Sequence, residues 1–289
     1  MTVTVKAPAK LNLTLEVGEK RADGYHEMKS VMQAVDLCDR VTLFTNDSGE
    51  ITLSITGATL PADPSNTAYK AARVFLHHIG RSDLGVHIDL EKHIPMQAGM
   101  AGGSADAAAV LVGLNQLTGA SLSGETLCAL GAKVGADVPF CVMGGAVLAS
   151  GIGTDLEAVT PLQDSWFVAV KPQVNVSTAE AYRATDSKEN LPHPDHEGMC
   201  RAMAAGDLSR VGALLENAFE AALQLPEVAA VQEAMRTFMP LGCLMTGSGS
   251  VVYALFADEA AAVRCADGLR AAYENVYICR PIADGAEVL

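Results

Sequence analysis

The sequence is poor in aromatic and in basic residues, and each shortage argues against a class of protein. Aromatic side chains make up 5% of the 289 residues, and there is a single tryptophan. Twenty lysine and arginine residues face 34 aspartate and glutamate residues, which gives a formal net charge of -14. A chain this acidic repels a phosphate backbone unless basic residues gather locally. We therefore expect no nucleic-acid partner.

Long apolar runs are also missing, and the cysteines are scattered. The N-terminal MTVTVKAPAK lacks the pattern of a secretory signal, and the most apolar later run, 138–149, is broken by proline and glycine. The seven cysteines include no pair at the short spacing of a zinc site or redox motif. These features predict a cytoplasmic protein without a membrane segment, whose cysteines are buried, reduced thiols.

What is present is a chain long enough for one large domain or two ordinary ones, with strands and helices mixed. Hydrophobic residues make up 49% of the chain, so a sizeable core is available. Alternating apolar residues predict strands over 2–17, 39–45, 50–57 and 85–95. Helical spacing predicts helices over 66–80, with Asn66 as N-cap, and over 104–117 and 123–134. The later pattern predicts strands within 144–159, 166–172, 251–256 and 276–281, and helices over 178–184, 196–204, 207–223, 226–239 and 258–273.

Residues 94–110, IPMQAGMAGGSADAAAV, carry three glycines and six alanines just before and within a predicted helix. Small residues let a backbone approach a ligand closely, and a glycine-rich turn that leads into a helix aims unpaired N–H groups at one point. With the Ser104 hydroxyl, this arrangement suits the phosphates of a nucleotide. Tight packing without a ligand explains the same composition and stays open as the alternative.

Two familiar nucleotide signatures do not match this chain. Residues 119–126, GASLSGET, have the spacing of a P-loop but Glu125 in place of its lysine, and no strand leads directly into GGSADA. A second glycine cluster, LMTGSGSVVYALF at 244–256, is either another anion-binding nest or a tight turn between a helix and a strand. The two clusters lie in different halves, which predicts a cleft between them.

Four segments in order resemble the GHMP small-molecule kinases: APAKLNLTLEVGEKRADGYHEMKSVM, IPMQAGMAGGSADAA, GADVPFC and TGSGSVVYALF. The resemblance runs from Lys6 to about Phe256. It implies a two-domain α+β fold, with a ribosomal-S5-like ATP-binding and catalytic domain over 1–157, a ferredoxin-like domain over 158–289, and the active site in the cleft between them. From the residues alone, the boundary falls near 155–162.

The resemblance also implies the reaction. The first segment is typical of the members that use ATP, with Mg²⁺, to phosphorylate the 2-hydroxyl of a diphosphocytidyl methylerythritol in the non-mevalonate isoprenoid pathway. Asp137 resembles the family's catalytic base, and Lys10 resembles the group that lowers the pKa of the hydroxyl and screens the transferring phosphoryl group. An ordinary loop aspartate and a solvent-facing strand lysine are the alternatives.

The binding residues are carried over from the same motifs. For the acceptor, the resemblance places Asn12, Tyr25 and His26 around the substrate, with Tyr182 stacking with Tyr25 across the cytosine and Thr178 as an accessory contact. The residues expected around ATP are Pro95, Met96, Gln97, Ala98, Gly99, Met100, Ala101, Gly102, Gly103, Ser104 and Ala105. The C-terminal glycine loop contributes Thr246, Gly247, Ser248 and Gly249.

Some features depart from the family or stay unassigned. Gln97, Ala101 and Ala105 stand where some relatives carry glycine or serine, and Gln97 is bulky enough to lean toward the adenine or ribose. For Asp106, a role toward the helix dipole is favoured over one toward magnesium, and the metal ligands are unassigned. A different GHMP kinase would lack the tyrosine pair, and an inactive relative would lack the lysine or the base. A purely structural α+β protein is the third alternative. We expect a monomer or a weak homodimer.

Overall fold

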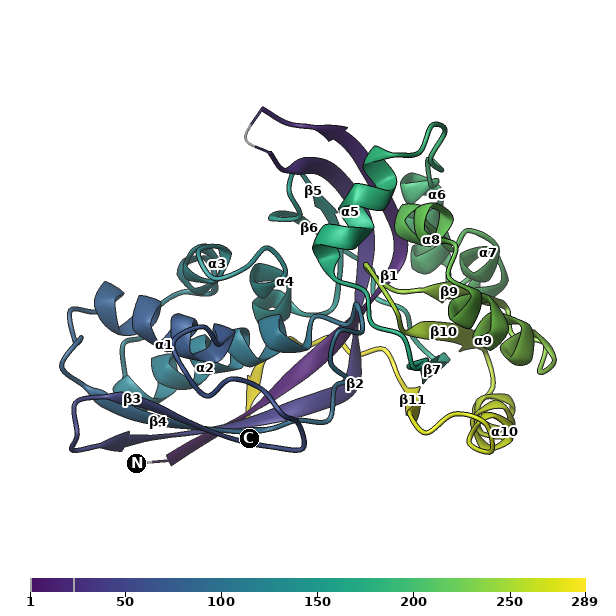
Figure 1. Ribbon diagram of the computed structural model, residues 1–289. Coiled ribbons are helices and arrows are strands. Elements are labelled where there is room, and N and C mark those ends of the chain that lie inside the picture. Colours follow the sequence, from purple (N-terminus) through teal and green to yellow (C-terminus); the bar gives the residue numbers. More distant parts are fainter. Residues whose placement is uncertain (1, 23) are drawn as a thin grey trace.

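The computed structural model describes residues 2–22 and 24–289 and contains two β-sheets that are connected through a long hairpin (Figure 1). Met1 and Asp23 lie outside the described residues, Asp23 being part of the first motif. The hairpin consists of β1 (Thr2–Lys20) and β2 (His26–Asn46), which pair antiparallel along most of their length. Both strands belong to the first sheet along their paired length, and helices of the second half of the chain also contact them.

The first sheet has eight strands, and two of them, β8 and β12, come from the last third of the chain. Its main order is β12-β1-β2-β4-β3, with β5 beside β2, β6 beside β5 and β8 beside β1. The strands besides the hairpin are β3 (Ile51–Thr56), β4 (Gly85–Glu91), β5 (Ala146–Ser150), β6 (Asp155–Val159), β8 (Glu216–Asn217) and β12 (Glu287–Val288).

Four helices lie on one side of this sheet (Figure 1). They are α1 (Thr67–His78), α2 (Gly102–Thr118), α3 (Gly124–Ala132) and α4 (Val138–Met143). The predicted N-cap is confirmed, because the Asn66 side chain accepts a hydrogen bond from the backbone N–H of Ala68. Helix α2 is buried on most of its surface, since it packs against both hairpin strands and the neighbouring helices. Its many alanines and glycines allow this close approach.

The second sheet has four antiparallel strands in the order β11-β7-β10-β9. They are β7 (Trp166–Val170), β9 (Gly242–Met245), β10 (Val252–Phe256) and β11 (Val276–Cys279). The helices of this half are α5 (Thr178–Asp186), α6 (His196–Ala205), α7 (Leu208–Ala213), α8 (Ala218–Leu223), α9 (Pro226–Arg236) and α10 (Glu259–Leu269). Helices α9 and α10 pack on the sheet and cover its apolar residues.

The single helix predicted over 207–223 is wrong. The chain leaves the helix after α7 and forms β8, which pairs parallel to β1, before α8 begins. Asn217 is the reason for the break, because its Oδ1 caps α8 by accepting the Phe219 N–H at 2.9 Å. Its Nδ2 donates to the carbonyls of Met245 and Gly247 at 2.7 and 2.9 Å, so this residue also holds the second glycine loop.

The central part of strand β1 is buried on both faces, unlike a strand with one exposed face. Alternating burial holds for its first residues, but residues 7–15 are buried without interruption. Helix α2 covers this segment, and residues of the second half of the chain also contact it. The backbone N–H of Asn12 donates to Thr246 Oγ1 at 3.0 Å, and the Tyr253 hydroxyl donates to the Asn12 carbonyl at 2.8 Å. Lys10 therefore does not face solvent, and the alternative of a solvent-facing lysine is excluded.

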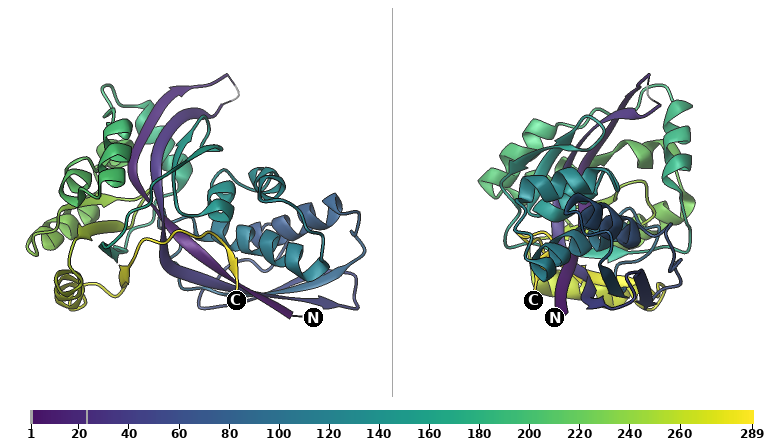
Figure 2. Two further views of the ribbon diagram at one scale, coloured as in Figure 1. Left: turned by 180° about the vertical axis from the view of Figure 1, so that it is seen from behind. Right: turned by 90° about the vertical axis from the view of Figure 1, so that its left-hand side faces the viewer.

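The two ends of the chain lie near each other (Figure 2), because β12 pairs with β1 through Val5 and Val288. Within residues 2–22 and 24–289, no helix combines the length and apolarity needed to cross a membrane. All seven cysteines are free thiols. The prediction that they are buried holds fully for three, Cys141, Cys265 and Cys279, and the other four are partly exposed.

Candidate active site

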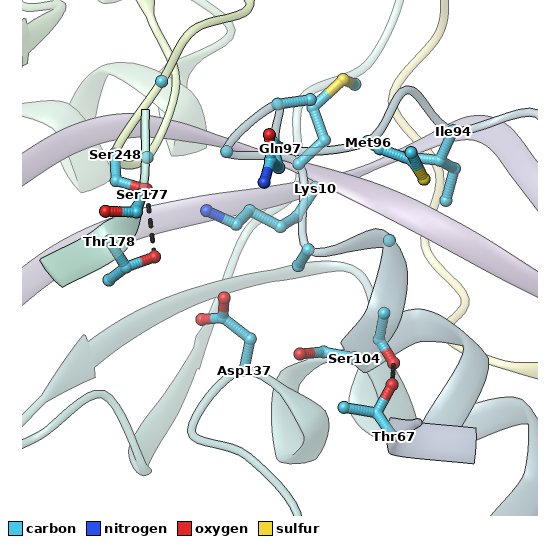
Figure 3. Close-up of a pocket in the computed structure, with 18 of the residues that line it drawn as sticks. Lys10, Thr67, Ile94, Met96, Gln97, Ser104, Asp137, Ser177, Thr178 and Ser248 are labelled. Carbon is cyan, nitrogen blue, oxygen red and sulfur yellow. Dashed lines mark hydrogen bonds between the residues drawn. The ribbon is translucent and has the colours of Figure 1, made fainter. Parts of the chain in front are cut away.

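A cavity of about 960 Å³ lies where the hairpin, helix α2 and the second glycine loop meet (Figure 3). Both halves of the chain line it. Most of the site residues expected from the sequence are among its lining residues: Lys10, Asn12, Tyr25, residues 95–104, Asp137, Thr178, Tyr182 and residues 247–249. Ala105, His26 and Thr246 are buried and are not among the lining residues.

The first glycine loop connects β4 to α2 and has an unusual backbone. Gln97, Gly99 and Ala101 have φ values of 48°, 74° and 59°, so every second residue is left-handed. Ala101 is the N-cap of α2, and its carbonyl accepts from the N–H groups of Ser104 and Ala105, both at 2.9 Å. The N–H groups before them belong to the open first turn, which contains no acidic residue. This helix end is therefore suited to an anion.

The two glycine loops interlock. A Cβ placed on Gly99 would lie 2.0 Å from the Thr246 carbonyl oxygen, and one placed on Gly247 would lie 2.6 Å from the Gly99 carbonyl oxygen. The backbone N–H of Val251 also donates to the Ala98 carbonyl at 3.2 Å. The glycines are required here because two backbones approach each other where a side chain would collide. The loops therefore form one continuous part of the cavity wall.

Lys10 extends from β1 into this cavity (Figure 3). Its side chain is nearly fully buried, and its Nζ donates to Asn12 Oδ1. Burial lowers the pKa of the Lys10 ammonium, and the nearby negative charge of Asp137 acts in the opposite direction. A polyanion in the cavity would favour the charged form of this lysine for the same electrostatic reason.

Asp137 faces the same space from the start of α4 (Figure 3). It is the N-cap residue of that helix, and Pro139 lies in the first turn. Within the described residues, its carboxylate makes no capping hydrogen bond, so it is not used to satisfy the helix end. The sequence predicted a constrained turn at this position, and the structure shows a half-buried carboxylate directed at the cavity beside Lys10.

The aromatic residues are arranged differently from the simplest expectation. Tyr25 and Tyr182 both line the cavity, but Tyr182 stacks on His26, with ring centroids 4.9 Å apart and planes inclined by 15°. Phe219 meets Tyr182 edge-on at 4.9 Å. His26 Nε2 lies 2.6 Å from Asp186 Oδ1, which orients the imidazole. His26 therefore packs against Tyr182, and its expected contact with the substrate stays a prediction, whereas Tyr25 lines the cavity and is 62% exposed.

A charged cluster beside the first glycine loop escaped the sequence analysis. Lys92 Nζ donates to Asp39 Oδ2 and, at 2.5 Å, to Asp106 Oδ2, and all three side chains are buried. The expectation that Asp106 serves the helix dipole is wrong, because its carboxylate is bound to this lysine. Asp39 and Lys92 lie in or beside strands that read as ordinary half-buried strands, so only their long-range contact distinguishes them.

Other lining residues also went unnoticed because nothing in their local pattern marks them. They come from the segment that leads into α1, from the β5–β6 turn and from the residues just before α5. These include Thr59, Leu60, Pro61, Ser65, Asn66, Thr67, Ile152, Val176 and Ser177. Thr67 Oγ1 donates to the Gly103 carbonyl at 2.8 Å, and the Thr178 and Ser248 hydroxyls lie 3.3 Å apart (Figure 3).

Comparison with known proteins agrees with this geometry. Residues 66–145 match the family model for the GHMP kinases N terminal domain, and residues 188–275 match that for the GHMP kinases C terminal. A 4-diphosphocytidyl-2-C-methyl-D-erythritol kinase of Exiguobacterium sibiricum is 43% identical over 286 residues, covering 98% of this chain and 99% of its own. The Bacillus subtilis protein of that name is 40% identical over 286 residues, covering 98% of each chain.

Solved structures show the same relationship. A crystal structure of 4-(cytidine 5'-diphospho)-2C-methyl-D-erythritol kinase matches with a TM-score of 0.80 and 34% identity, over 98% of this chain and 100% of that one. The homoserine kinase of Cytophaga hutchinsonii also gives a TM-score of 0.80, over 100% and 97% of the two chains, at 23% identity. A likeness at that lower identity shows the fold alone.

The chain is a small-molecule kinase and belongs to the GHMP kinases. Within them, it belongs to the family of the 4-diphosphocytidyl-2-C-methyl-D-erythritol kinases, which match it along nearly its full length. The family resemblance and the two-domain α+β fold predicted from the four motifs are confirmed.

Proposed function

We propose that this kinase transfers the γ-phosphoryl group of ATP to the 2-hydroxyl of 4-diphosphocytidyl-2-C-methyl-D-erythritol, a step in the non-mevalonate pathway to isoprenoid precursors. One observation carries the proposal. Lys10, Asp137 and both glycine loops face a single cavity, in a chain that is 43% identical to a kinase of that name. A cavity of about 960 Å³ has room for a nucleotide and a second ligand together.

The fit to ATP rests on the first glycine loop and the start of α2. The left-handed residues of the loop and the open first turn present backbone N–H groups where a triphosphate has its charge. Phosphoryl transfer depends mainly on positioning and on stabilising charge, which these groups and Lys10 supply. ATP, when bound, supplies the phosphoryl group, and the interlocked loops fix where its phosphates lie.

Mg²⁺ is part of the proposal as the partner of ATP. Among the described residues, no group of three metal-ligating side chains gathers at one point. In this proposal Mg²⁺ keeps several of its waters and is held by the substrate phosphates together with one or two protein oxygens, as is usual for this ion in kinases. The oxygens of Asp137 and of the hydroxyl residues lining the cavity are among the donors available to it.

The acceptor chemistry is assigned to two side chains. Asp137 accepts the proton of the acceptor hydroxyl, because its carboxylate lines the cavity and is not used by its own helix. Lys10 stabilises negative charge on the transferring group and on the activated oxygen. Burial disfavours the charged form of Lys10, so a bound phosphate and the lysine ammonium stabilise each other.

Recognition of the cytidine end is assigned to the aromatic wall. Tyr182 is held by His26 on one side and Phe219 on its edge, so its exposed surface is pre-organised for a flat base. Tyr25 lines the same cavity and stacks on the other face of the base in this proposal. Asn12 and Thr178 contact the rest of the acceptor. We also propose that residues 1–157 and 158–289 are the domains, and that the protein is cytoplasmic and a monomer or weak homodimer.

Coupled ADP release tests the proposal directly. The purified protein is given Mg²⁺ and ATP with diphosphocytidyl methylerythritol, mevalonate or homoserine, and a reaction without acceptor measures background hydrolysis. We expect ADP release above background with the cytidylyl compound alone. Release with mevalonate or homoserine instead, or with none of the three, contradicts the proposed acceptor.

A further inference from the structure

The buried Asp39–Lys92–Asp106 cluster connects three parts of the fold. Asp39 lies in β2, Lys92 follows β4, and Asp106 lies in α2. The second oxygen of Asp39 is also used: its Oδ1 accepts the backbone N–H groups of His93 and Ile94 at 2.6 and 2.8 Å. Both carboxylate oxygens of Asp39 therefore bind residues at the beginning of the first glycine loop.

The same cluster reaches the other end of that loop. The loop begins after Lys92 and ends in α2, where Asp106 accepts from the Lys92 ammonium at 2.5 Å. One lysine thus closes the segment that carries the left-handed residues and the open helix end. Lys92 and Asp106 line the cavity, whereas Asp39 is not among the described residues that line it.

Burying charges costs desolvation free energy unless the charges are paired and hydrogen-bonded. This cluster therefore holds the loop at a larger desolvation cost than an apolar contact would. Two carboxylates share one ammonium here. Burial raises the pKa of the Asp106 carboxyl to about 7, with the Lys92 charge opposing the rise and the Asp39 charge adding to it.

We propose that Asp39 is a positioning residue for the nucleotide: through Lys92 and the backbone of residues 93–94, it fixes both ends of the first glycine loop against β2. It acts from behind the loop and touches no ligand. Loss of Asp39 shifts the loop's N–H groups relative to the phosphates. A misplacement of about 1 Å in groups that position a substrate lowers the reaction rate by up to about 100-fold. The inference rests on the proposed use of ATP and does not depend on which acceptor is used.

Two variants of Asp39 separate its geometry from its charge. Asp39→Ala and Asp39→Asn both remove the negative charge and leave Lys92 paired one-to-one with Asp106. Only Asp39→Asn keeps an oxygen that can accept the loop's backbone N–H groups. In Asp39→Asn the amide NH₂ cannot accept from the Lys92 ammonium, so that contact is lost while the backbone contacts stay. We therefore expect the dissociation constant of ATP to rise about 10- to 100-fold in Asp39→Ala and by a smaller factor, less than about 10-fold, in Asp39→Asn.

The two ligands used are a non-transferable ATP analogue with Mg²⁺ and, separately, the diphosphocytidyl substrate. Their affinities are measured by calorimetry, after circular dichroism has shown that each variant has the native fold. Affinity for the diphosphocytidyl substrate is expected to stay within about threefold in both variants, because the residues of its aromatic wall, His26, Tyr182 and Phe219, come from the start of β2, α5 and α8 and not from the first glycine loop. Asp36→Ala is the matched control, since Asp36 also lies in β2 and accepts a backbone N–H, that of Arg280 at 2.7 Å, away from the loop. It is expected to bind the analogue as wild type does.

Three results overturn the inference. Asp39→Ala binds the analogue as tightly as wild type does, its affinity falls equally for the analogue and the diphosphocytidyl substrate, or the affinity of Asp39→Asn for the analogue falls as far as that of Asp39→Ala. If Asp39→Ala does not fold, Asp39→Leu takes its place, because it also removes both acceptor oxygens while filling the buried space, and the same outcomes decide. Failure of the wild-type protein to bind the analogue would overturn the proposed use of ATP itself, which is a different result from equal binding by wild type and variant.

Discussion

Replacing Gly99 with alanine tests whether the two glycine loops must touch. Gly99 has φ of +74°, and an added Cβ would lie 2.0 Å from the Thr246 carbonyl oxygen. Gly119 offers a matched control at the end of α2, because its φ of +67° is nearly the same but a Cβ there meets nothing within 4 Å. Both substitutions therefore place an alanine in the left-handed region, but only Gly99→Ala also brings a Cβ into collision with the Thr246 carbonyl.

The expected magnitudes follow from those two contributions. A non-glycine residue in the left-handed region costs about 1 to 2 kcal/mol, so Gly119→Ala should lower the free energy of unfolding by about that amount. Forcing an extra carbon into a packed contact costs about 1 to 3 kcal/mol more. Gly99→Ala should therefore lose about 2 to 5 kcal/mol in total. Because the added carbon forces the two glycine loops apart, the N–H groups that position the phosphates should also shift.

Urea unfolding at equilibrium measures the first effect, and steady-state kinetics measures the second. We expect Gly99→Ala to raise the KM for ATP and to lower kcat by about 10-fold or more, whereas Gly119→Ala keeps near-normal kinetics. Equal stability losses in the two variants, together with unchanged kinetics in Gly99→Ala, would refute the reasoning that the loops require this close approach.

Three further outcomes follow from the site and its surroundings. Tyr182→Ala should weaken binding of the cytidylyl substrate by about 10-fold or more while leaving ATP affinity nearly unchanged, and equal losses by calorimetry would contradict base stacking. Lys10→Met should lower kcat by about 10²- to 10³-fold in the ADP-release assay, and a near-normal kcat would remove this lysine from the mechanism. Burial raises the pKa of Glu16, but hydrogen bonds from His193 and His196 outweigh it and lower that pKa below its usual 4.5. The stabilisation is therefore present above about pH 4.5 and is lost as the pH falls through the lower folded value. Glu16→Gln should flatten the acid side of the stability curve measured by urea unfolding, and an unchanged curve would contradict this linkage.

Much of the local structure could be predicted because its causes lie close together in the sequence. The cap of α1 is an asparagine directly before an apolar helical pattern, and α2 follows a run of glycine and alanine. Positive φ values favour small residues, so the glycine and alanine content of residues 94–103 is enough to indicate a tight loop there. The motifs around Lys10 and Asp137 indicated the lining residues because each motif is a short, continuous stretch of the chain.

What could not be predicted depends on contacts between distant segments. The burial of Lys10 follows from helix α2 and the second half of the chain covering β1 together, and no local pattern contains that information. The break at Asn217 follows from pairing of β8 with β1, which competes with a continuous helix. An asparagine inside a helical pattern is itself a capping signal, so this break had one local sign that could have been used.

The charged cluster was missed for a related reason. Asp39 and Lys92 are 53 residues apart, and a lysine at the end of a strand normally faces solvent. Asp106 lies near the start of a helix, where the dipole alone is a sufficient local explanation for an acidic residue. The structure replaces that explanation because it brings a buried ammonium within hydrogen-bond distance.

The most direct test of the central claim, that Asp137 and Lys10 perform phosphoryl transfer in the cavity between the glycine loops, is to measure turnover and ligand affinity together in Asp137→Asn. The amide keeps the size of the side chain but cannot accept the acceptor's proton as a carboxylate does. The account predicts that both ligands bind within about threefold of wild type while kcat falls by about 10²- to 10⁴-fold. Near-normal turnover in this variant would contradict it.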